Sequence, residues 1–212
     1  MVSVKRLEDI TETDDAIMVY KPITFDSFEA RKEYFIKTYS PILGTPVVNK
    51  LIAEGFLTAP ASTKYHGNYE GGLFDHSANV AEILVQLTKN NNLTWDSEHV
   101  DADGINRSPW IVGILHDLCK IDDYRKAPEG SQYPYEHNPE PIIKGHGMKS
   151  VIYCTGLGLT RLTQEEATCI IYHMGAYTPA EEWKAYNNAV SKVPNVAWTH
   201  LADLLASHVM EV

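Results

Sequence analysis

The chain has 212 residues, of which 44% are hydrophobic and 22% charged, so it can bury the core of one domain and carries no long disordered tract. Its formal net charge of -10 disfavours a long nucleic acid as partner, because such binding relies on lysine and arginine, but a small phosphorylated ligand held by a metal remains open. Three scattered cysteines, no signal peptide and no apolar run long enough to span a membrane predict a soluble, cytoplasmic protein without disulfides.

Helix signals recur along the chain. Asp26 and Glu29 have the spacing of a capping box, which predicts a helix over 28–39. Further segments begin with an N-capping residue or proline, end at glycine, or repeat apolar residues with the helical period. They predict helices over 46–54, 73–87, 110–121, 147–154, 164–173 and 180–192, and a last helix from Pro194 almost to Val212.

No segment alternates polar and apolar residues over five or more positions, so the predicted fold class is all-α. One irregular segment, Asp122–Gly145, is long and rich in proline and tyrosine. A loop of that length in a compact domain is usually functional, and it leaves room for a small hairpin. No internal repeat or linker divides the chain, which predicts a single domain over 1–212.

Four histidines fall on, or at the start of, four different predicted helices, namely His76, His116, His146 and His173. Asp203 lies on a fifth predicted helix. A helical bundle builds a metal site in this way, because each helix directs one ligand to a common centre. Imidazole and carboxylate groups suit Zn, Mn, Fe or Ni, so the pattern predicts a site for a divalent transition metal.

The adjacent pair His116-Asp117 is placed by the prediction inside an otherwise apolar helix. An unpaired, ionised aspartate buried there would cost several kcal/mol, and a bound metal removes that cost. The alternative is an ion pair between Asp117 and Lys120, one turn further along. The other candidate ligands, spread over the whole domain, favour the metal.

Five segments together resemble the HD-domain phosphohydrolase superfamily, and in chain order they are APASTKYHGNYEGGLFDHSANV (59–80), GILHDLCKI (113–121), GHGMKSV (145–151), IYHMG (171–175) and HLADLLA (200–206). The order H…HD…H…H…D is similar to the branch of this superfamily with two metals. The resemblance implies an HD-domain helical bundle with its core over about 66–208, an N-terminal helical extension over 1–65, and the irregular loop near the active site. The stretch before His76 resembles HD domains of 3′-end RNA exonucleases and of small phage or bacterial hydrolases. Residues 1–58 do not resemble the OB-fold of those exonucleases.

The resemblance implies two sets of metal ligands that share Asp117. The first set is His76, His116, Asp117 and Asp203. The second set is His146 and His173, with Asp117 as the bridge. Two ions of Mn, Fe, Ni, Zn or Mg held in this way can share a hydroxide, which would be the nucleophile that attacks phosphorus.

The predicted catalytic side chains are Asp117, Lys120 and His66. Lys120 lies one turn after the His-Asp pair, where it would stabilise phosphate oxygens or protonate the leaving group. The alternative for Lys120 is a surface ion pair with Asp123. By the resemblance, His66 would contact the substrate or transfer a proton, and the alternative is a histidine that stabilises the following turn.

The predicted substrate-binding residues are Lys120, Gly72, Tyr124 and Arg125. The Gly72 amide lies at a helix N-terminus, where phosphate groups bind, although a tight turn alone also accounts for this glycine. Arg125 could bind a phosphate, and Tyr124, Tyr133 or Tyr135 could stack on a base. For each of these loop residues the alternative is a solvated position on the surface.

The sequence therefore predicts an enzyme that cleaves a phosphoester or phosphodiester of a nucleotide or a short, cyclic oligonucleotide. Two alternatives stay open. One is a 3′–5′ exonuclease on single-stranded RNA or DNA, which the negative charge and the missing OB-fold disfavour. The other is a nucleotide-binding module without turnover, which the complete set of candidate ligands disfavours. The sequence makes no prediction of oligomeric state.

Overall fold

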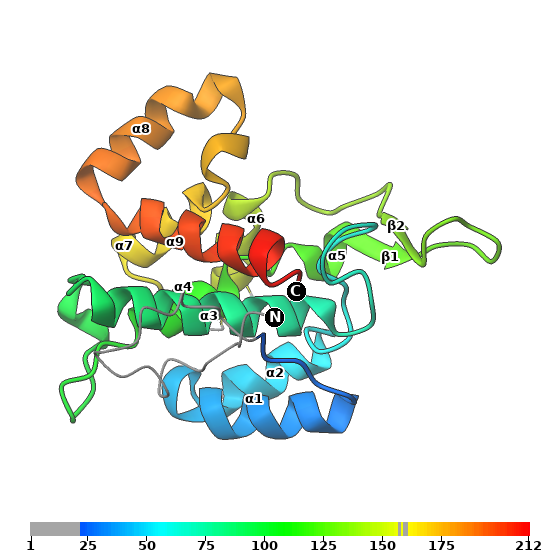
Figure 1. The fold of residues 1–212 in the computed structure, drawn as a ribbon, viewed down its shortest axis with the longest axis horizontal. Helices are drawn as coiled ribbons and strands as arrows, with labels where there is room; N and C mark the ends of the chain where they lie inside the picture. The colour runs from blue at the N-terminus through cyan, green and yellow to red at the C-terminus, as the bar shows by residue number, and fades with distance from the viewer. Residues whose placement is uncertain (1–21, 157, 159–160) are drawn as a thin grey trace, which may run out of the picture.

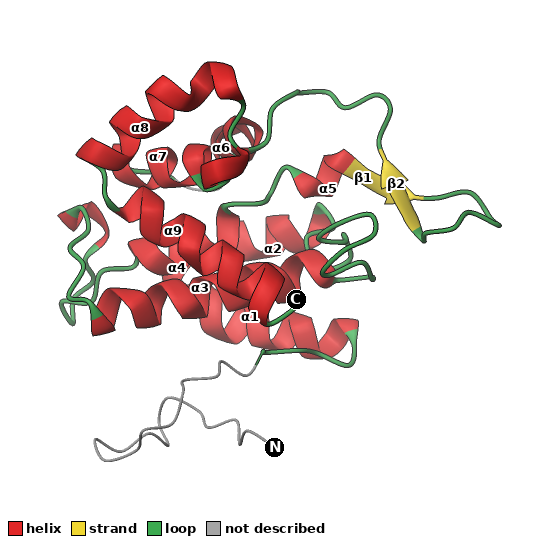
Figure 2. Cartoon of the chain, turned by 45° about the horizontal axis from the view of Figure 1, so that its top comes forward, coloured by secondary structure: helices red, strands yellow, loops and turns green. Residues whose placement is uncertain are grey.

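The computed structural model describes residues 22–156, 158 and 161–212, which form a bundle of helices with one projecting hairpin (Figures 1 and 2). The predicted all-α class is confirmed. The first 21 residues of the predicted N-terminal extension lie outside the described residues. The α-helices are α1 (Phe28–Leu43), α2 (Thr45–Ala53), α3 (Gly72–Asn90), α4 (Ser108–Leu115), α5 (Lys120–Asp123), α6 (Gly147–Gly156), α7 (Gln164–Tyr172), α8 (Trp183–Lys192) and α9 (Asn195–Leu204). Short 3-10 helices are η2 (Ser97–His99), η3 (Gly175–Tyr177) and η4 (Ala180–Glu182).

Helix α1 is capped by Ser27, whose hydroxyl oxygen accepts a hydrogen bond of 3.2 Å from the Ala30 amide. The predicted capping box of Asp26 and Glu29 is therefore wrong by one position. Ser27 has the extended backbone of an N-cap residue, and its short hydroxyl reaches an amide of the first turn that has no partner within the helix.

A buried ion pair joins α1 to the first turn of α3. The Arg31 guanidinium donates to both carboxylate oxygens of Asp75, at 2.7 and 2.9 Å, and the Tyr69 hydroxyl donates to the same carboxylate at 3.0 Å. Pairing satisfies charges that would otherwise be costly to bury. Asp75 is thus directed at α1, whereas the next residue, His76, points about 100° around the helix, toward Asp117 and Asp203.

Helices α3 and α4 pack closely because a glycine lies between them. A β-carbon at Gly113 would lie only 2.3 Å from the Cα atom of Ala81, which is too close for any residue other than glycine. This approach of the two backbones brings His76 on α3 and His116 after α4 to the same side of the bundle, with ring centroids 5.3 Å apart.

The predicted helix over 110–121 is interrupted, which corrects the sequence-based expectation. Helix α4 ends at Leu115 and α5 begins at Lys120. Between them the Leu118 amide donates to Leu115 and the Lys120 amide to Asp117, in the tighter i to i+3 pattern. The His116-Asp117 pair therefore lies in a turn between α4 and α5.

The irregular segment contains the small hairpin that the sequence left open. Strands β1 (Tyr124–Lys126) and β2 (Tyr135–His137) pair antiparallel, with Tyr124 opposite His137 and Lys126 opposite Tyr135. The hairpin projects from one end of the molecule beside α5 (Figure 2).

Helix α7 opens with the predicted capping box, in which Thr163 and Glu166 bond each other's main-chain amides. His173 is the residue directly after this helix. Asp203 lies on α9, which continues as a π-helical turn over Leu205–Val209. The final residue, Val212, folds back and is buried.

The buried apolar side chains of the described residues form one continuous cluster from Phe35 on α1 to Val212. The three cysteines, Cys119, Cys154 and Cys169, are buried and unbonded to one another, as predicted. No helix within the described residues combines the length and apolar character that crossing a membrane requires.

Candidate metal centre

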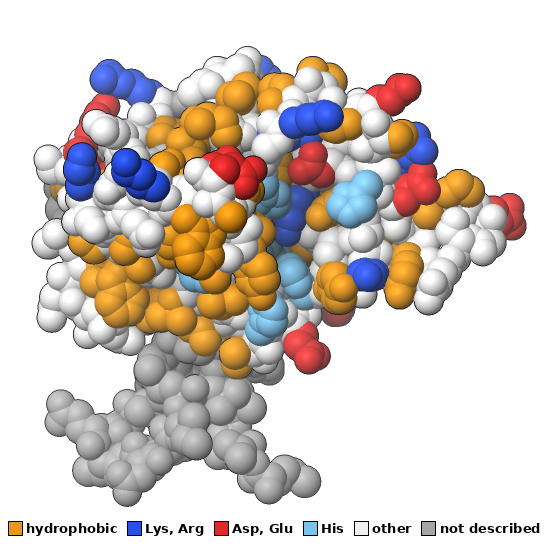
Figure 3. Space-filling view, turned by 90° about the horizontal axis from the view of Figure 1, so that it is seen from above, with side chains coloured by type: hydrophobic (Ala, Val, Ile, Leu, Met, Phe, Trp, Pro, Cys, Tyr) orange, Lys and Arg blue, Asp and Glu red, His pale blue; other side chains and the backbone are white. Residues whose placement is uncertain are grey.

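The structure brings all six predicted ligands together. His76 comes from α3, His116 and Asp117 from the turn after α4, His146 from the residue before α6, His173 from the end of α7, and Asp203 from α9. We call these six residues the His-Asp cluster. Three of its histidines and Asp117 are buried, whereas the His146 side chain is 29% exposed and the Asp203 side chain 18% exposed, so the cluster has an open side. Figure 3 shows histidine side chains along a hollow in one face of the molecule, with a basic side chain between them.

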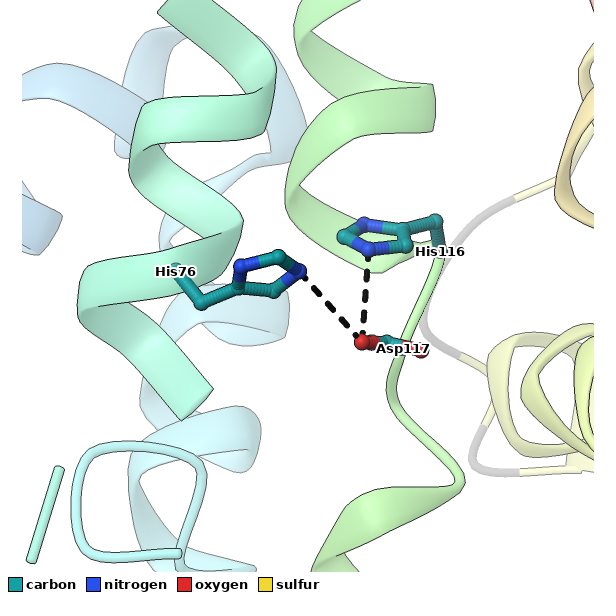
Figure 4. A group of neighbouring side chains, drawn as sticks. All are labelled: His76, His116 and Asp117. Atoms are coloured by element: carbon teal, nitrogen blue, oxygen red, sulfur yellow. Dashed lines mark ion pairs between the residues drawn. The ribbon is translucent and has the colours of Figure 1, made fainter. Parts of the chain in front are cut away.

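Asp117 lies at the middle of the cluster, and its two carboxylate oxygens face different histidines. Oδ2 lies 3.6 Å from Nε2 of His76 and 3.3 Å from Nε2 of His116 (Figure 4). Oδ1 lies 2.7 Å from Nε2 of His146 and 3.4 Å from Nε2 of His173. A carboxylate placed between two pairs of imidazoles has the arrangement of a group that bridges two cations.

Asp203 completes one side of the cluster. Its Oδ1 lies 3.2 Å from Nε2 of His76 and 4.0 Å from Nε2 of His116. Burial raises the pKa of Asp203, but the neighbouring His76, His116 and His173 lower it more, so the net shift is downward. The carboxylate is therefore ionised at neutral pH and available as a ligand.

In each of the three buried histidines, Nδ1 lies within hydrogen-bond distance of a main-chain oxygen. Nδ1 of His76 lies 2.8 Å from the oxygen of Val212, Nδ1 of His116 lies 2.7 Å from that of Gly113, and Nδ1 of His173 lies 2.7 Å from that of Ile170. Because a carbonyl oxygen only accepts, Nδ1 carries the proton in each ring. In the neutral ring, the form that binds a metal ion, Nε2 is then the nitrogen with a free lone pair.

Those three Nε2 atoms are buried and lack a hydrogen-bond partner among the described residues. Buried polar atoms are nearly always satisfied, so three orphaned lone pairs around one carboxylate need an explanation. Divalent transition ions would satisfy them, and imidazole with carboxylate is the donor set that these ions take. Within the His-Asp cluster, three groups have ligand atoms within 4.8 Å of one another: His76-His116-Asp117, His116-His173-Asp203 and Asp117-His146-His173. A fourth such group, Cys119-Asp123-His146, borders the cluster. The residues present therefore fit divalent metal ions.

Lys120 is buried and its ammonium lies 2.5 Å from Oδ2 of Asp117. Burial lowers the pKa of Lys120, but Asp117, Tyr124 and Asp203 together raise it more, and the net shift is upward. The predicted alternative of a surface pair between Lys120 and Asp123 is wrong, because Asp123 pairs with Lys149 instead. The predicted ion pair of Lys120 with Asp117 does form, and it forms beside the histidines rather than in their place.

His66 lies at the edge of the cluster, with its ring centroid 4.9 Å from that of His76. Burial, together with His76 and the Lys120 charge, lowers the pKa of His66 to about 3, so the ring is neutral at physiological pH. Its Nε2 is buried without a partner among the described residues. The ring is thus placed beside the cluster with an unused nitrogen.

The structure gives Gly72 a packing role. Its amide donates to the Tyr69 carbonyl at 3.0 Å, so the amide is not available to a phosphate. A β-carbon at Gly72 would lie 2.0 Å from the main-chain oxygen of Gly67, which only glycine avoids. These contacts support the tight turn over a phosphate contact, and Gly72 is not retained among the proposed substrate-binding residues.

Tyr124 and Arg125 differ in their surroundings. The Tyr124 side chain is half-buried, packs on His137 at 5.2 Å between ring centroids, and lies close enough to Lys120 and Asp117 for their charges to influence its pKa. Arg125 lies on the opposite face of the hairpin and pairs with Glu136 at 2.6 Å, both side chains being exposed. Only Tyr124 lies next to the His-Asp cluster.

Two residues of the site were missed by the sequence-based predictions. Cys119 Sγ lies 3.3 Å from Nδ1 of His146, in the position that main-chain oxygens occupy for the other histidines. Lys149 is fully buried and bonds Asp122 and Asp123 at 2.6 and 2.5 Å, which ties α6 to α5. The position of Cys119, two residues after the predicted ligand Asp117, was the one sequence signal that placed it near the site. Nothing in the sequence pairs Lys149 with α5.

Part of the chain is similar to a known protein. The chain is 33% identical over 79 residues to the dihydroneopterin 2′,3′-cyclic phosphate phosphodiesterase of Methanocaldococcus jannaschii. The aligned part covers 37% of this chain and 29% of that protein, so most of the relative's length has no counterpart in the match. No protein-family model matches the chain. No solved structure matches it either.

Proposed function

We propose that the chain is a metal-dependent phosphohydrolase of the HD type, which cleaves a phosphoester or phosphodiester of a nucleotide or a short, cyclic oligonucleotide. The observation that carries this proposal is Asp117, whose two oxygens each face a pair of imidazole Nε2 atoms. The partial match to a cyclic phosphate phosphodiesterase supports the same class of reaction.

In the proposed centre the six cluster residues divide into two ligand sets that share Asp117. The first set is His76, His116 and Asp203 with Oδ2 of Asp117. The second set is His146 and His173 with Oδ1 of Asp117. Divalent ions bound there would supply Lewis acidity toward phosphate oxygens and toward water.

The chain's own residues then position and neutralise the substrate. Lys120 keeps a positive charge at the buried end of the site, where it stabilises negative charge that develops on the phosphoryl oxygens. His66 presents a neutral Nε2 beside His76, where it can hold or transfer a proton of the substrate. Asp117 contacts both Lys120 and the histidines and so fixes their relative positions.

A small, nucleotide-like phosphate compound is the proposed substrate class. The net charge of -10 counts against a long nucleic acid, and the relative's substrate is a cyclic phosphate of a small molecule by its name. We include 2′,3′-cyclic nucleotides for that reason.

Removal of metal provides the direct test. Dialysis against EDTA is expected to abolish hydrolysis of a panel of nucleoside monophosphates and 2′,3′-cyclic phosphates, and one of Mn, Fe, Ni, Zn or Mg is expected to restore it. A radiolabelled single-stranded RNA and DNA ladder in the same assay reports exonuclease activity. Absence of turnover on the whole panel, in protein that metal analysis shows to be loaded, would leave a binding module as the better description.

Cys119 is proposed as a positioning residue for His146. Replacing Cys119 with alanine is expected to weaken binding of the second ion by about 10- to 100-fold, because His146 loses the partner of its Nδ1. Isothermal titration with Mn or Zn measures the two affinities separately. Cys119→Ser keeps a hydrogen-bond acceptor and is expected to recover most of the loss.

The matched control for this substitution is Cys154→Ala, which removes another buried, free thiol away from the cluster. It is expected to bind both ions as the parent protein does. Equal metal affinities of the Cys119→Ala and Cys154→Ala variants would contradict a positioning role for Cys119.

A further inference from the structure

A cavity of about 320 Å³ lies between the β1–β2 hairpin and the loop that joins α2 to α3. We call it the hairpin cavity. Its walls include two acidic residues, two basic residues and several apolar or aromatic ones, among them Glu54, Glu70, Arg125, Lys126, Pro60, Ile121, Tyr124 and Tyr135. Small-molecule sites begin at roughly this volume and combine apolar walls with a few polar groups. No ligand of the proposed metal centre lines the hairpin cavity, so it is a separate compartment.

The strand register turns two tyrosines toward this cavity. Tyr124 and Lys126 lie two residues apart and share one face of β1, and Lys126 is paired with Tyr135 on β2. Tyr124 and Tyr135 are therefore on the same face of the hairpin, and both line the cavity together with Arg125 and Lys126. Tyr135 is only 8% exposed, whereas Tyr133 in the connecting loop is 39% exposed and does not line the cavity.

The hairpin cavity adjoins the His-Asp cluster through α5. Ile121 in its wall directly follows Lys120, whose ammonium contacts Asp117. Tyr124 lines the cavity while lying within electrostatic reach of Lys120 and Asp117. The cavity and the His-Asp cluster therefore share the segment from Lys120 to Tyr124.

The wall chemistry indicates what kind of ring fits. Tyrosine, proline and isoleucine side chains suit the flat faces of an aromatic ring, and base–aromatic stacking tolerates any such ring. Glu54 and Glu70 add carboxylates, which only accept hydrogen bonds and so favour rings with N–H donors. The basic wall residues Arg125 and Lys126 are each paired with a glutamate, Glu136 and Glu70. Glu70 faces Lys126 at 3.6 Å in an exposed pair, an interaction weak enough to exchange for a ligand.

We propose that the hairpin cavity binds a planar nitrogen heterocycle with an exocyclic amino group, such as an aminopurine base. The inference rests on the proposed function in one respect: the phosphate of the same molecule is held at the metal centre. The cavity would thus select the organic part of the substrate, and the His-Asp cluster would act on its phosphate.

Binding of guanosine, which has no phosphate, tests the cavity directly. Ligand-observed NMR on the full chain is expected to detect guanosine binding, and Tyr135→Ala is expected to weaken it by about tenfold or more through lost stacking. Tyr133→Ala removes a tyrosine of the same hairpin that lies outside the cavity, and it is expected to retain the parent affinity. Equal affinities of the two tyrosine variants would overturn the assignment.

A second variant covers the case in which Tyr135→Ala disturbs the hairpin. Glu54→Gln lies on the rim of the cavity outside the hairpin, and glutamine keeps the shape while adding a donor. The parent protein is expected to prefer guanosine to inosine, which lacks the amino group, by about tenfold, as a hydrogen bond to a charged group allows. Glu54→Gln and the double variant Glu54→Gln/Glu70→Gln are expected to reduce this preference stepwise, and an unchanged preference in both would contradict the inference.

Hydrolysis of bis(4-nitrophenyl) phosphate, which carries no nucleobase, separates this inference from the proposed function. Turnover of this compound by protein that does not bind guanosine would reject the cavity assignment and leave the metal centre intact. Guanosine binding without turnover of any phosphoester would reject the proposed function and leave the cavity assignment intact.

Discussion

Replacing Asp117 with asparagine is expected to abolish binding of both metal ions and to lower turnover by more than about 100-fold, since even outer contacts of a metal site can cause losses of that size. Asn keeps the shape of Asp117 but removes the charge that both pairs of histidines face. Its amide nitrogen would also point a donor at one pair, where an ion would need an acceptor.

Two measurements check this prediction independently of activity. Metal analysis of the purified variant is expected to show loss of bound ions. The second measurement is thermal unfolding with and without the ion. An ion at 100 times its Kd stabilises a folded protein by about 2.7 kcal/mol, and this stabilisation is expected to vanish in Asp117→Asn. Asp101→Asn removes a carboxylate in a loop remote from the cluster, and it is expected to keep both the ions and the thermal shift. A variant at Asp117 that retains two ions would contradict the bridging role.

Replacing Lys120 with methionine is expected to lower kcat by about 100- to 1,000-fold, the usual effect of removing one group that stabilises transition-state charge. Methionine keeps most of the buried volume of the side chain but not the ammonium that lies 2.5 Å from Asp117. Metal affinity is expected to stay the same or increase, since a positive charge next to the ligand set has been removed. Lys120→Arg keeps the charge, and its kcat is expected to lie between those of the parent protein and Lys120→Met.

The separation of kcat from metal affinity distinguishes this role from a structural one. A lysine that only neutralised Asp117 would be replaceable by the bound ion, and Lys120→Met would then turn over substrate normally. Lys144→Met is the control, because Lys144 is exposed and lies two residues before His146. Steady-state kinetics with a saturating metal concentration measures all three variants.

Much of the helical framework could be predicted from local sequence signals. The capping box of Thr163 and Glu166 forms as predicted, because both partners lie within one turn of the same helix. The spacing of His76, His116, His146, His173 and Asp203 likewise predicted a common centre, and the described helices bring these residues together. Each of these inferences depends on short-range geometry or on one ligand per helix.

The predictions that proved wrong needed information from distant parts of the chain. The continuous helix over 110–121 was expected because its residues are apolar, but hydrophobicity alone does not report the tight turn after Leu115. A surface ion pair with Asp123 was the predicted alternative for Lys120. It is wrong because Lys120 is buried, and this burial depends on how α5 packs against other helices. The role of Gly72 followed from the approach of Gly67, which no local pattern encodes.

The His116-Asp117 pair illustrates the division between the two levels. Residue types and their spacing are enough to predict a helical chain. They also predict that a histidine next to an aspartate, with further histidines at domain-wide spacing, has the donor types of a metal site. The folded chain adds that the pair lies in a turn after α4 and that the two oxygens of Asp117 face different pairs of imidazoles. It also adds the partners of the four Nδ1 atoms, which are Val212, Gly113, Ile170 and Cys119. The reason is physical: residue type sets which groups can bind a cation, whereas the direction of each lone pair is set by contacts between segments far apart in the chain.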